Sequence, residues 1–475
     1  MDTNLFLRKR DFGNITPELI DRFQGIVGER FAATSLEVLS TYSHDWTENF
    51  RFLPHLVVFP ANTQEVAEAL RLCSENNIPV TPVGARTGLS GGMLPVYGGV
   101  ALSLERMNQI LEIDTANLQV RVQPGVITGV LQEAVAKLGL YYPPDPSSKG
   151  SCFIGGNLAE SSGGIHAVKY GITRDYVLAL EAVLPSGEII HTGAKVLKNS
   201  TGYNLTQLLV GSEGTLAVIT EATLRLVHQP KYSLIMQAPF ESAEDCCDAV
   251  SAIFHTGIVP AALEFMEQDA IRYAQNYLKV NHYQLEGIGA LLLIEVDGNN
   301  LDILWQECEI ISAVISKYKG GEVMVAESAE QQQALWALRR CLGKAVKGNT
   351  IYKEEDTVVP RAYLAKLLRF VKKKGIEFGF ESVCYGHAGD GNLHINILKN
   401  DISDDRWEHE LPQAIREIFE YTVSLGGTLS GEHGIGYVQR PYMDIAFSAT
   451  ELTILKNIKQ VFDPQGILNP GKIFL

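Results

Sequence analysis

Basic residues are scarce in this chain. Its 475 residues carry 40 lysines and arginines against 55 aspartates and glutamates, which gives a formal net charge of −15. No long run of basic residues occurs, so a bulk attraction to nucleic acid is not expected. No apolar stretch is long enough to span a membrane, and the N-terminal sequence MDTNLFLRKR has no apolar core of signal-peptide length. We therefore expect a cytoplasmic protein, with peripheral attachment to a membrane left open.

Organised cysteine motifs are also missing. The seven cysteines are scattered, only Cys246 and Cys247 are adjacent, and no CxxC motif occurs. These spacings argue against a disulfide framework, a zinc ribbon and an iron–sulfur cluster. The cysteine usage fits a reducing compartment, and any iron–sulfur relay would have to lie on another chain.

Glycine, by contrast, is abundant, and many of the 43 glycines gather in the clusters Gly84–Gly92, Gly155–Gly164 and Gly211–Gly214. Consecutive backbone N–H groups with little side-chain bulk form concavities that bind anions such as a pyrophosphate. Neither the P-loop pattern nor the Rossmann glycine spacing occurs. One such cluster alone is more often an ordinary turn, but three together indicate a long ligand wrapped by several segments.

The hydrophobic pattern changes near residue 230 and favours an α+β protein. The first part alternates short strands with helices, and the second part has long amphipathic helices between strands. The expected helices are Thr63–Asn76, Ile127–Leu138, Ala243–Phe254, Leu301–Lys317 and Glu330–Lys347, and the expected strands include Gly289–Val296 and a hairpin of Leu178–Leu184 with Ile189–Thr192. The last fifty or so residues return to glycine-rich loops.

The segment from His387 to His394, HAGDGNLH, is the clearest metal signal. Residues seven apart on one straight strand face opposite sides, but the Gly-Asp-Gly sequence predicts a turn that would bring both imidazoles to one end of a hairpin. The carboxylate candidate is Glu432, in the glycine-rich sequence SGEHGIG. Two imidazoles and a carboxylate suit Zn, which we favour, and also Mn or Fe. A lone histidine more often completes a core hydrogen bond, but this combination favours a metal site.

Arg339 and Lys353 are candidate anion clamps, because an arginine can grip a carboxylate through two parallel hydrogen bonds. Arg339 lies in the helical sequence LWALRR, and Lys353 lies in the sequence IYKEED. The alternative for either residue is a solvated, purely structural position.

The order of these motifs resembles one family. The shared features are Gly84–Gly92, PPDP at 143–146, IGGN at 154–157, SGG at 162–164, YG at 170–171, GY at 202–203 and GSEGT at 211–215. The chain resembles the FAD-linked oxidases of the vanillyl-alcohol-oxidase type, in the branch of D-lactate dehydrogenase, D-2-hydroxyglutarate dehydrogenase and the glycolate oxidase FAD subunit. The resemblance implies a two-subdomain FAD-binding domain at 1–230, an α+β (ferredoxin-like) cap domain at 231–420, and a C-terminal segment at 421–475 that returns to the FAD domain.

The resemblance also implies roles for individual residues. His387, His394 and Glu432 become metal ligands, His433 the general base, and Arg339, Lys353 and Asn396 substrate contacts. The residues implied to bind FAD are Gly84, Arg86, Thr87, Gly88, Ser90, Gly91, Pro144, Asp145, Gly155, Gly156, Asn157, Ser162, Gly163, Tyr170, Glu213, Gly214, Ile219 and Asn469. The first glycine loop lacks the histidine that holds FAD covalently in some members, so we expect dissociable FAD.

The implied reaction is oxidation of a small D-2-hydroxy acid, with D-lactate or glycolate favoured, to the 2-oxo acid by hydride transfer to flavin N5. Members that take five-carbon dicarboxylates carry a threonine four residues after the arginine, where this chain has Gly343; D-2-hydroxyglutarate is therefore the alternative substrate. Two alternatives belong to other functional classes: a metal-dependent hydrolase and a non-enzymatic FAD-binding protein. The hydrolase leaves the glycine clusters unexplained. The acceptor (a quinone, a cytochrome, an electron-transfer flavoprotein or an iron–sulfur subunit) and a homodimeric state stay open.

Overall fold

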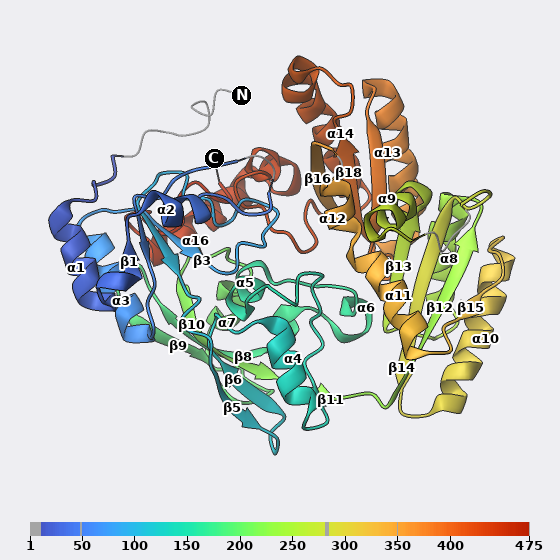
Figure 1. Cartoon of the computed structure of the whole chain (residues 1–475), viewed down its shortest axis with the longest axis horizontal. Helices are drawn as coiled ribbons and strands as arrows, with labels where there is room; N and C mark the ends of the chain where they lie inside the picture. Colours follow the sequence, from blue (N-terminus) through green and yellow to red (C-terminus); the bar gives the residue numbers. More distant parts are fainter. Residues whose placement is uncertain (1–10, 48–49, 281–284, 349, 475) are drawn as a thin grey trace. The chain divides into compact units, whose positions relative to one another are not determined.

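The computed structural model describes residues 11–47, 50–280, 285–348 and 350–474, so the expectation for the first ten residues lies outside the described part of the chain. These residues form two compact units (Figure 1). The first unit joins the residues up to Gly163, Ile172–Gln229 and the chain from Glu432 onward, and the second joins Gly164–Gly171 and Pro230–Gly431. Within the described residues, no helix is both long and apolar enough to cross a membrane.

The first unit contains a mixed four-stranded sheet in the order β1–β2–β4–β3, packed against helices. Strands β2, β4 and β3 run parallel, and β1 is antiparallel to β2. The bounds are β1 Ala32–Ala33, β2 Leu56–Val58, β3 Val80–Val83, β4 Val100–Ser103, α1 Pro17–Val27 and α3 Thr63–Glu75. Helix α3 begins where the sequence predicts, because the Asn62 side chain accepts a hydrogen bond from the Glu65 N–H. Phe23 and Leu70 of the two helices lie in the core of this sheet.

A second, antiparallel sheet completes the first unit, in the order β5–β6–β10–β8–β9. The predicted hairpin at 178–192 is confirmed as its strands β8 and β9. The bounds are β5 Ile110–Asp114, β6 Gln119–Val122, β8 Val177–Val183, β9 Ile189–Gly193, β10 Val218–Arg225, α4 Thr128–Ala136, α5 Ile154–Glu160 and α7 Leu205–Leu209. Its apolar core is separate from that of the first sheet, which gives the unit two subdomains.

The end of the chain returns to the first sheet. After helix α16 (Ala449–Phe462), Leu468 forms a parallel bridge with Val80, and the Asn469 N–H donates to the Val80 carbonyl oxygen at 2.7 Å. The C-terminal segment therefore supplies backbone partners to a strand near the beginning of the chain.

The second unit is built on a seven-stranded antiparallel sheet in the order β15–β12–β14–β13–β17–β18–β16. Its first four strands, with helices α8 and α10 in the crossovers, have the strand order of a ferredoxin-like sheet, and an additional helix, α9, lies between β13 and β14. The strands are β12 Tyr232–Phe240, β13 Ala262–Glu267, β14 Ala290–Gly298, β15 Met324–Val325, β16 Tyr352–Val358, β17 Glu381–Gly386 and β18 Asn392–Leu398. The α+β fold expected from the sequence is confirmed.

Three helices cover the sheet face that carries Tyr385, namely α9 (Gln268–Leu278), α11 (Ala329–Arg340) and α12 (Leu342–Lys347). Helices α8 (Ala243–Phe254), α10 (Leu301–Lys317) and α13 (Leu364–Phe378) also pack against the strands. The sequence predicts one helix over 330–347, but the structure has a break at Cys341. Leu338, Cys341, Leu342 and Val346 all stay in the same core, so the apolar spacing continues across the break and does not reveal it.

Candidate metal and substrate site

The predicted turn between the two histidines closes the hairpin of β17 and β18. Within it, the Asn392 N–H donates to the His387 carbonyl oxygen at 3.1 Å, and the Gly391 N–H donates to that of Ala388 at 3.2 Å. Gly391 has a φ of +85°, and a Cβ there would overlap the carbonyl oxygen of Val359. Only glycine fits this position without strain. The turn brings the His387 and His394 rings to a centroid distance of 5.4 Å.

Three donor atoms from His387, His394 and Glu432 lie within 4.8 Å of one another. Both histidines are buried. Glu432 directly follows Gly431, whose N–H donates to a carboxylate oxygen of Asp356 at 2.9 Å, so the chain next to Glu432 is anchored on β16. Two imidazoles and one carboxylate at this spacing fit a divalent cation with open coordination positions.

A buried carboxylate orients one of the candidate ligands. Glu264 on β13 accepts a hydrogen bond from Nδ1 of His387, with distances of 2.9 and 3.0 Å to its two oxygens. This contact fixes the tautomer and leaves Nε2 of His387 for a metal. Glu264 also lies 2.7 Å from Nε of Arg339. Burial alone would raise the pKa of Glu264, but the His387 ring and the Arg339 guanidinium lower it below its ordinary value.

Arg339 is buried on helix α11, beside the same cluster of side chains. Its guanidinium carbon lies 5.2 Å from the centroid of the Tyr385 ring. Its Nη2 atom is buried and has no hydrogen-bond acceptor among the described residues. A buried guanidinium with a donor to spare is suited to a substrate carboxylate.

Lys353 does not join this cluster. It lies on β16, where alternate residues face opposite sides of the sheet. Its ammonium group lies 5.6 Å from the centroid of the Trp407 ring. The neighbouring residue Glu354 pairs across the sheet with Asn396. Asp356, which lies two residues after Glu354, pairs with His394. These four side chains therefore lie on the sheet face opposite to that of Lys353. Asn396 is buried there and donates to the Val383 carbonyl oxygen at 3.3 Å.

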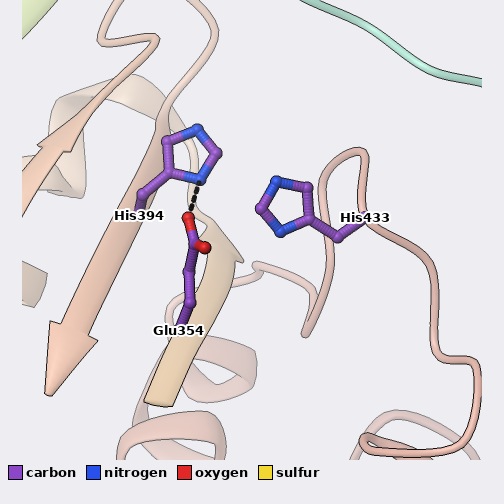
Figure 2. Close-up of side chains that lie close together, drawn as sticks. All are labelled: Glu354, His394 and His433. Atoms are coloured by element: carbon purple, nitrogen blue, oxygen red, sulfur yellow. Dashed lines mark ion pairs between the residues drawn. The ribbon is translucent and has the colours of Figure 1, made fainter. Parts of the chain in front are cut away.

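Glu354 is a functional candidate that the sequence analysis missed. Figure 2 shows its carboxylate next to the His394 ring, with the His433 ring nearby. Its Oε1 atom lies 3.6 Å from Nδ1 of His394, and Glu354, His394 and His433 form a second group with the spacing of metal ligands. The alternation of β16 is the signal that could have identified it, since Glu354 and Asp356 share a face. His394 belongs to both groups, so His433 lies near the first ligand group.

The three glycine clusters, apart from Gly164, come together in the first unit. A Cβ on Gly84 would lie 3.7 Å from the backbone nitrogen of Gly156, so the first two clusters face each other. The Gly211 N–H donates to the Leu158 carbonyl oxygen at 2.8 Å, which joins the third cluster to α5. The hydroxyls of Ser90 and Ser161 are buried and have no hydrogen-bond partner in the part of the chain that the structure describes. Backbone N–H groups and spare hydroxyls fit the phosphate groups of FAD.

The other residues expected to bind FAD fall into three groups. Gly84, Arg86, Thr87, Gly88, Ser90 and Gly91 lie in the loop between β3 and β4; Pro144, Asp145, Gly155, Gly156, Asn157, Ser162 and Gly163 lie before, in and after α5; and Glu213, Gly214 and Ile219 lie before and in β10. Asn469 joins the first and third groups, because its amide donates to the carbonyl oxygens of Gly92 at 2.9 Å and Glu213 at 2.8 Å.

Tyr170 differs from this set because it belongs to the second unit. It lies in helix α6 (Ala167–Tyr170), and its hydroxyl donates to a carboxylate oxygen of Asp297 at 2.6 Å. In the same segment, His166 lies 3.1 Å from the carboxylate of Glu295. Segment 164–171 is therefore bound to strand β14.

Two family models match the chain. The model for the C-terminal domain of FAD-linked oxidases matches residues 229–473, and the model for an FAD-binding domain matches residues 54–193. Together they match parts of both units.

Several curated proteins are similar over nearly their full length. A D-lactate dehydrogenase from Anaerostipes hadrus is 40% identical over 97% of this chain and 98% of that protein. The glycolate oxidase subunit GlcD from Bacillus subtilis (strain 168) is 41% identical over 91% and 92%. A D-2-hydroxyglutarate dehydrogenase from Stutzerimonas stutzeri (strain A1501) is 34% identical over 96% and 99%.

Solved structures share the fold. p-Cresol methylhydroxylase with substrate bound superposes with a TM-score of 0.81 at 16% identity, covering 97% of this chain and 98% of that chain. A 4-ethylphenol oxidase from Gulosibacter chungangensis superposes with a TM-score of 0.76 at 19% identity, covering 98% of each chain.

Proposed function

Because this chain belongs to the family of FAD-linked oxidases, we propose that it uses FAD and a divalent cation to oxidise a small D-2-hydroxy acid to the 2-oxo acid. The observation that carries this proposal is the ligand group of His387, His394 and Glu432 beside a buried arginine. The names of the relatives, which act on D-lactate, glycolate and D-2-hydroxyglutarate, support the substrate class. A hydrolase would give the FAD-binding domain no role.

His387, His394 and Glu432 would hold the cation, for which Zn is favoured and Mn or Fe also fit. When bound, such a cation lowers the pKa of a coordinated hydroxyl, and FAD accepts the two electrons that leave the substrate as a hydride. Glu264 keeps Nδ1 of His387 engaged, so that Nε2 is the atom presented for ligation. The first glycine cluster has no histidine or cysteine, which supports dissociable FAD.

His433 is the proposed general base. It follows Glu432 in sequence and lies beside His394 and Glu354 (Figure 2), close to where the substrate hydroxyl would be held. A ring nitrogen of His433 would accept the proton of the 2-hydroxyl group. Removal of that proton leaves an alkoxide, from which the hydride at C2 is lost more easily.

Arg339 is the proposed carboxylate clamp. Glu264 fixes its Nε side, and its buried Nη2 donor would bind a carboxylate oxygen of the substrate. Binding the carboxylate orients the adjacent C2 atom. The substrate then loses less freedom of motion on reaching the transition state, which lowers the entropic part of the barrier. Lys353 has no part in this proposal, because it lies on the opposite face of the sheet.

We favour D-lactate or glycolate over D-2-hydroxyglutarate. Gly343 supplies no hydroxyl at the position where a dicarboxylate would gain one, and a Cβ built there would lie 3.6 Å from the Tyr385 hydroxyl. The electrons would pass to a separate acceptor. Relatives named as subunits support a partner chain in that role, although a quinone or an electron-transfer flavoprotein would serve equally.

An anaerobic titration tests the proposal. Purified protein is mixed with D-lactate, glycolate and D-2-hydroxyglutarate in turn, flavin bleaching is followed, and bound metal is measured by elemental analysis. We expect a flavin spectrum, about one bound cation per chain, and bleaching with D-lactate or glycolate. A colourless protein, or a flavin that no 2-hydroxy acid reduces, would refute the proposed reaction.

Two variants separate the metal from the base. His394→Ala should lose the cation and activity together, and a chelator acting on the parent protein should reproduce this. His433→Asn should keep flavin and cation but lose flavin reduction. His409→Asn is the control, because the side chain of His409 is 69% exposed and its ring bonds Asp405, four residues earlier on the same helical segment. Normal flavin reduction in His433→Asn would exclude His433 as the base.

A further inference from the structure

The carboxylate of Glu213 grips the loop that follows the proposed base. One oxygen accepts the Ile435 N–H at 2.8 Å, and the other accepts the Gly436 N–H at 2.6 Å. Two N–H donors on one carboxylate form a charge-assisted pair, which is stronger than the same bonds to a neutral acceptor. Burial raises the pKa of Glu213, and the two N–H groups oppose that rise because they stabilise the charged form.

The backbone of Glu213 is itself held in place. Its N–H donates to the Ala159 carbonyl oxygen at 2.8 Å, and its carbonyl oxygen accepts the Asn469 amide at 2.8 Å. Glu213 adopts a left-handed conformation with a φ of +52°, which few residues other than glycine adopt. A non-glycine residue kept in such a conformation is a sign that its side chain is needed there.

The gripped loop fits its surroundings only because of its glycines. Gly434 has a φ of +79°, and a Cβ there would overlap the carboxylate of Glu160 and lie 3.1 Å from that of Glu213. Gly436 has a φ of +51°, and a Cβ there would overlap the carbonyl oxygen of Ser90. The backbone therefore lies directly against the two carboxylates at Gly434 and against Ser90 at Gly436, with no room for a side chain at either position.

The same stretch of chain is anchored at its other end. The Ser430 hydroxyl and the Gly431 N–H both donate to Asp356, at 2.8 and 2.9 Å. Only Glu432, His433 and Gly434 lie between the two anchored ends. Carboxylates thus hold the backbone on both sides of the two residues to which the proposed function gives the chemistry.

We propose that Glu213 is a positioning residue for His433: by fixing the backbone at Ile435 and Gly436, it holds the imidazole where it can take the substrate proton. This assignment rests on the proposed role of His433 as base. The Glu213 carboxylate then affects the reaction by fixing the loop that carries His433. This role is separate from any contact between FAD and the backbone of the GSEGT segment. Errors of about 1 Å in such a position cost about 100-fold in rate.

The test uses Glu213→Gln and Glu213→Asp in the flavin-loaded protein. The glutamine keeps one acceptor oxygen but presents an N–H₂ group to a backbone N–H, so one of the two bonds is lost. We expect normal flavin and metal content, and a rate of flavin reduction at saturating substrate about 10–100-fold lower, with little change in KM. The aspartate keeps the charge and both oxygens, so it should restore part of the rate.

A double variant identifies the residue through which Glu213 acts. If Glu213 works by positioning His433, adding Glu213→Gln to His433→Asn causes no further loss of rate. Losses that multiply would overturn the proposal, as would a loss of FAD that accounts for the lost activity. Glu181→Gln is the matched control in the same unit, because the Glu181 carboxylate accepts from the Thr220 hydroxyl on β10. A normal rate in His433→Asn alone would instead refute the proposed function.

Discussion

The Nδ1 atom of His387 lies 2.9 Å from a carboxylate oxygen of Glu264, although 123 positions separate the two residues in the sequence. The same carboxylate lies 2.7 Å from Nε of Arg339. One buried acid therefore sets the orientation of a proposed metal ligand and of the proposed substrate clamp together. Metal affinity and substrate affinity should respond jointly to changes at this residue.

Glu264→Gln should weaken metal binding. The amide cannot accept from both neighbours as the carboxylate does, so His387 loses the partner that fixes its tautomer. We expect an affinity for Zn about 10–100-fold lower, measured by titrating the metal-stripped protein. Glu295→Gln is the control, since Glu295 is also a carboxylate of the same sheet bound to a histidine, His166. Equal metal affinities in the two variants would contradict the role of Glu264.

Gly391→Ala should disrupt the hairpin turn and release the metal. Its Cβ would overlap the Val359 carbonyl oxygen, in addition to the strain of a φ of +85°. Gly257→Ala isolates the strain, because Gly257 has a φ of +88° with no atom within 4 Å of its Cβ position. The control should cost about 1–2 kcal/mol of unfolding free energy, and Gly391→Ala clearly more. Urea unfolding and elemental analysis of bound metal check both variants. Equal losses of unfolding free energy in the two variants would contradict the prediction, because they would show that the overlap with Val359 costs nothing.

Gly343→Thr should shift substrate preference toward the five-carbon dicarboxylate. A Cβ at Gly343 would meet the Tyr385 hydroxyl at 3.6 Å, which is ordinary contact, so a side chain fits. The new hydroxyl can donate to a second substrate carboxylate, a bond to a charged group worth about 1.5–3 kcal/mol. We expect the kcat/KM ratio of D-2-hydroxyglutarate to D-lactate to rise about tenfold or more. Gly343→Ala should leave that ratio unchanged, because it adds bulk without a donor.

Lys472 should make stability increase with pH. Burial and the nearby Arg440 lower its pKa to about 7, although Asp45 and Glu213 oppose the shift. Between pH 7 and the ordinary lysine pKa of 10.5, Lys472 is protonated in the unfolded chain but not in the folded chain. The free energy of unfolding therefore increases as the pH rises through this range. The stability of the parent relative to Lys472→Met should increase by about 1 kcal/mol per pH unit above pH 7. Urea unfolding at several pH values checks this, and parallel profiles would contradict it.

Much of the fold could be predicted from local patterns. Helices such as Ala243–Phe254 and Leu301–Lys317 begin and end as the apolar spacing predicts, because side-chain caps at Ser242 and Asn300 agree with that spacing. The excursion of 164–171 into the second unit left no signal, since it depends on contacts of His166 and Lys169 with strand β14. Such contacts depend on the tertiary arrangement and have no local period.

The site divides in the same way. The turn between His387 and His394 could be read from its glycines, because backbone conformation dictates that residue type. Glu264 could not be found, because its partners, His387 in the turn after β17 and Arg339 on α11, are distant in sequence. Lys353 and Glu354 are adjacent and both charged, and only the register of β16 against β18 decides which one faces His394.

The bridge between Val80 and Leu468 also affects the order in which the two units can fold during translation. The strand that contains Val80 is made long before its bridge partner Leu468, which lies much further along the sequence. The second unit is contiguous from Pro230 to Gly431 apart from one short segment, so its sheet can form during translation. The first unit therefore lacks this pairing until residues 468 and 469 have been made, and a nascent chain stalled before residue 468 cannot form it.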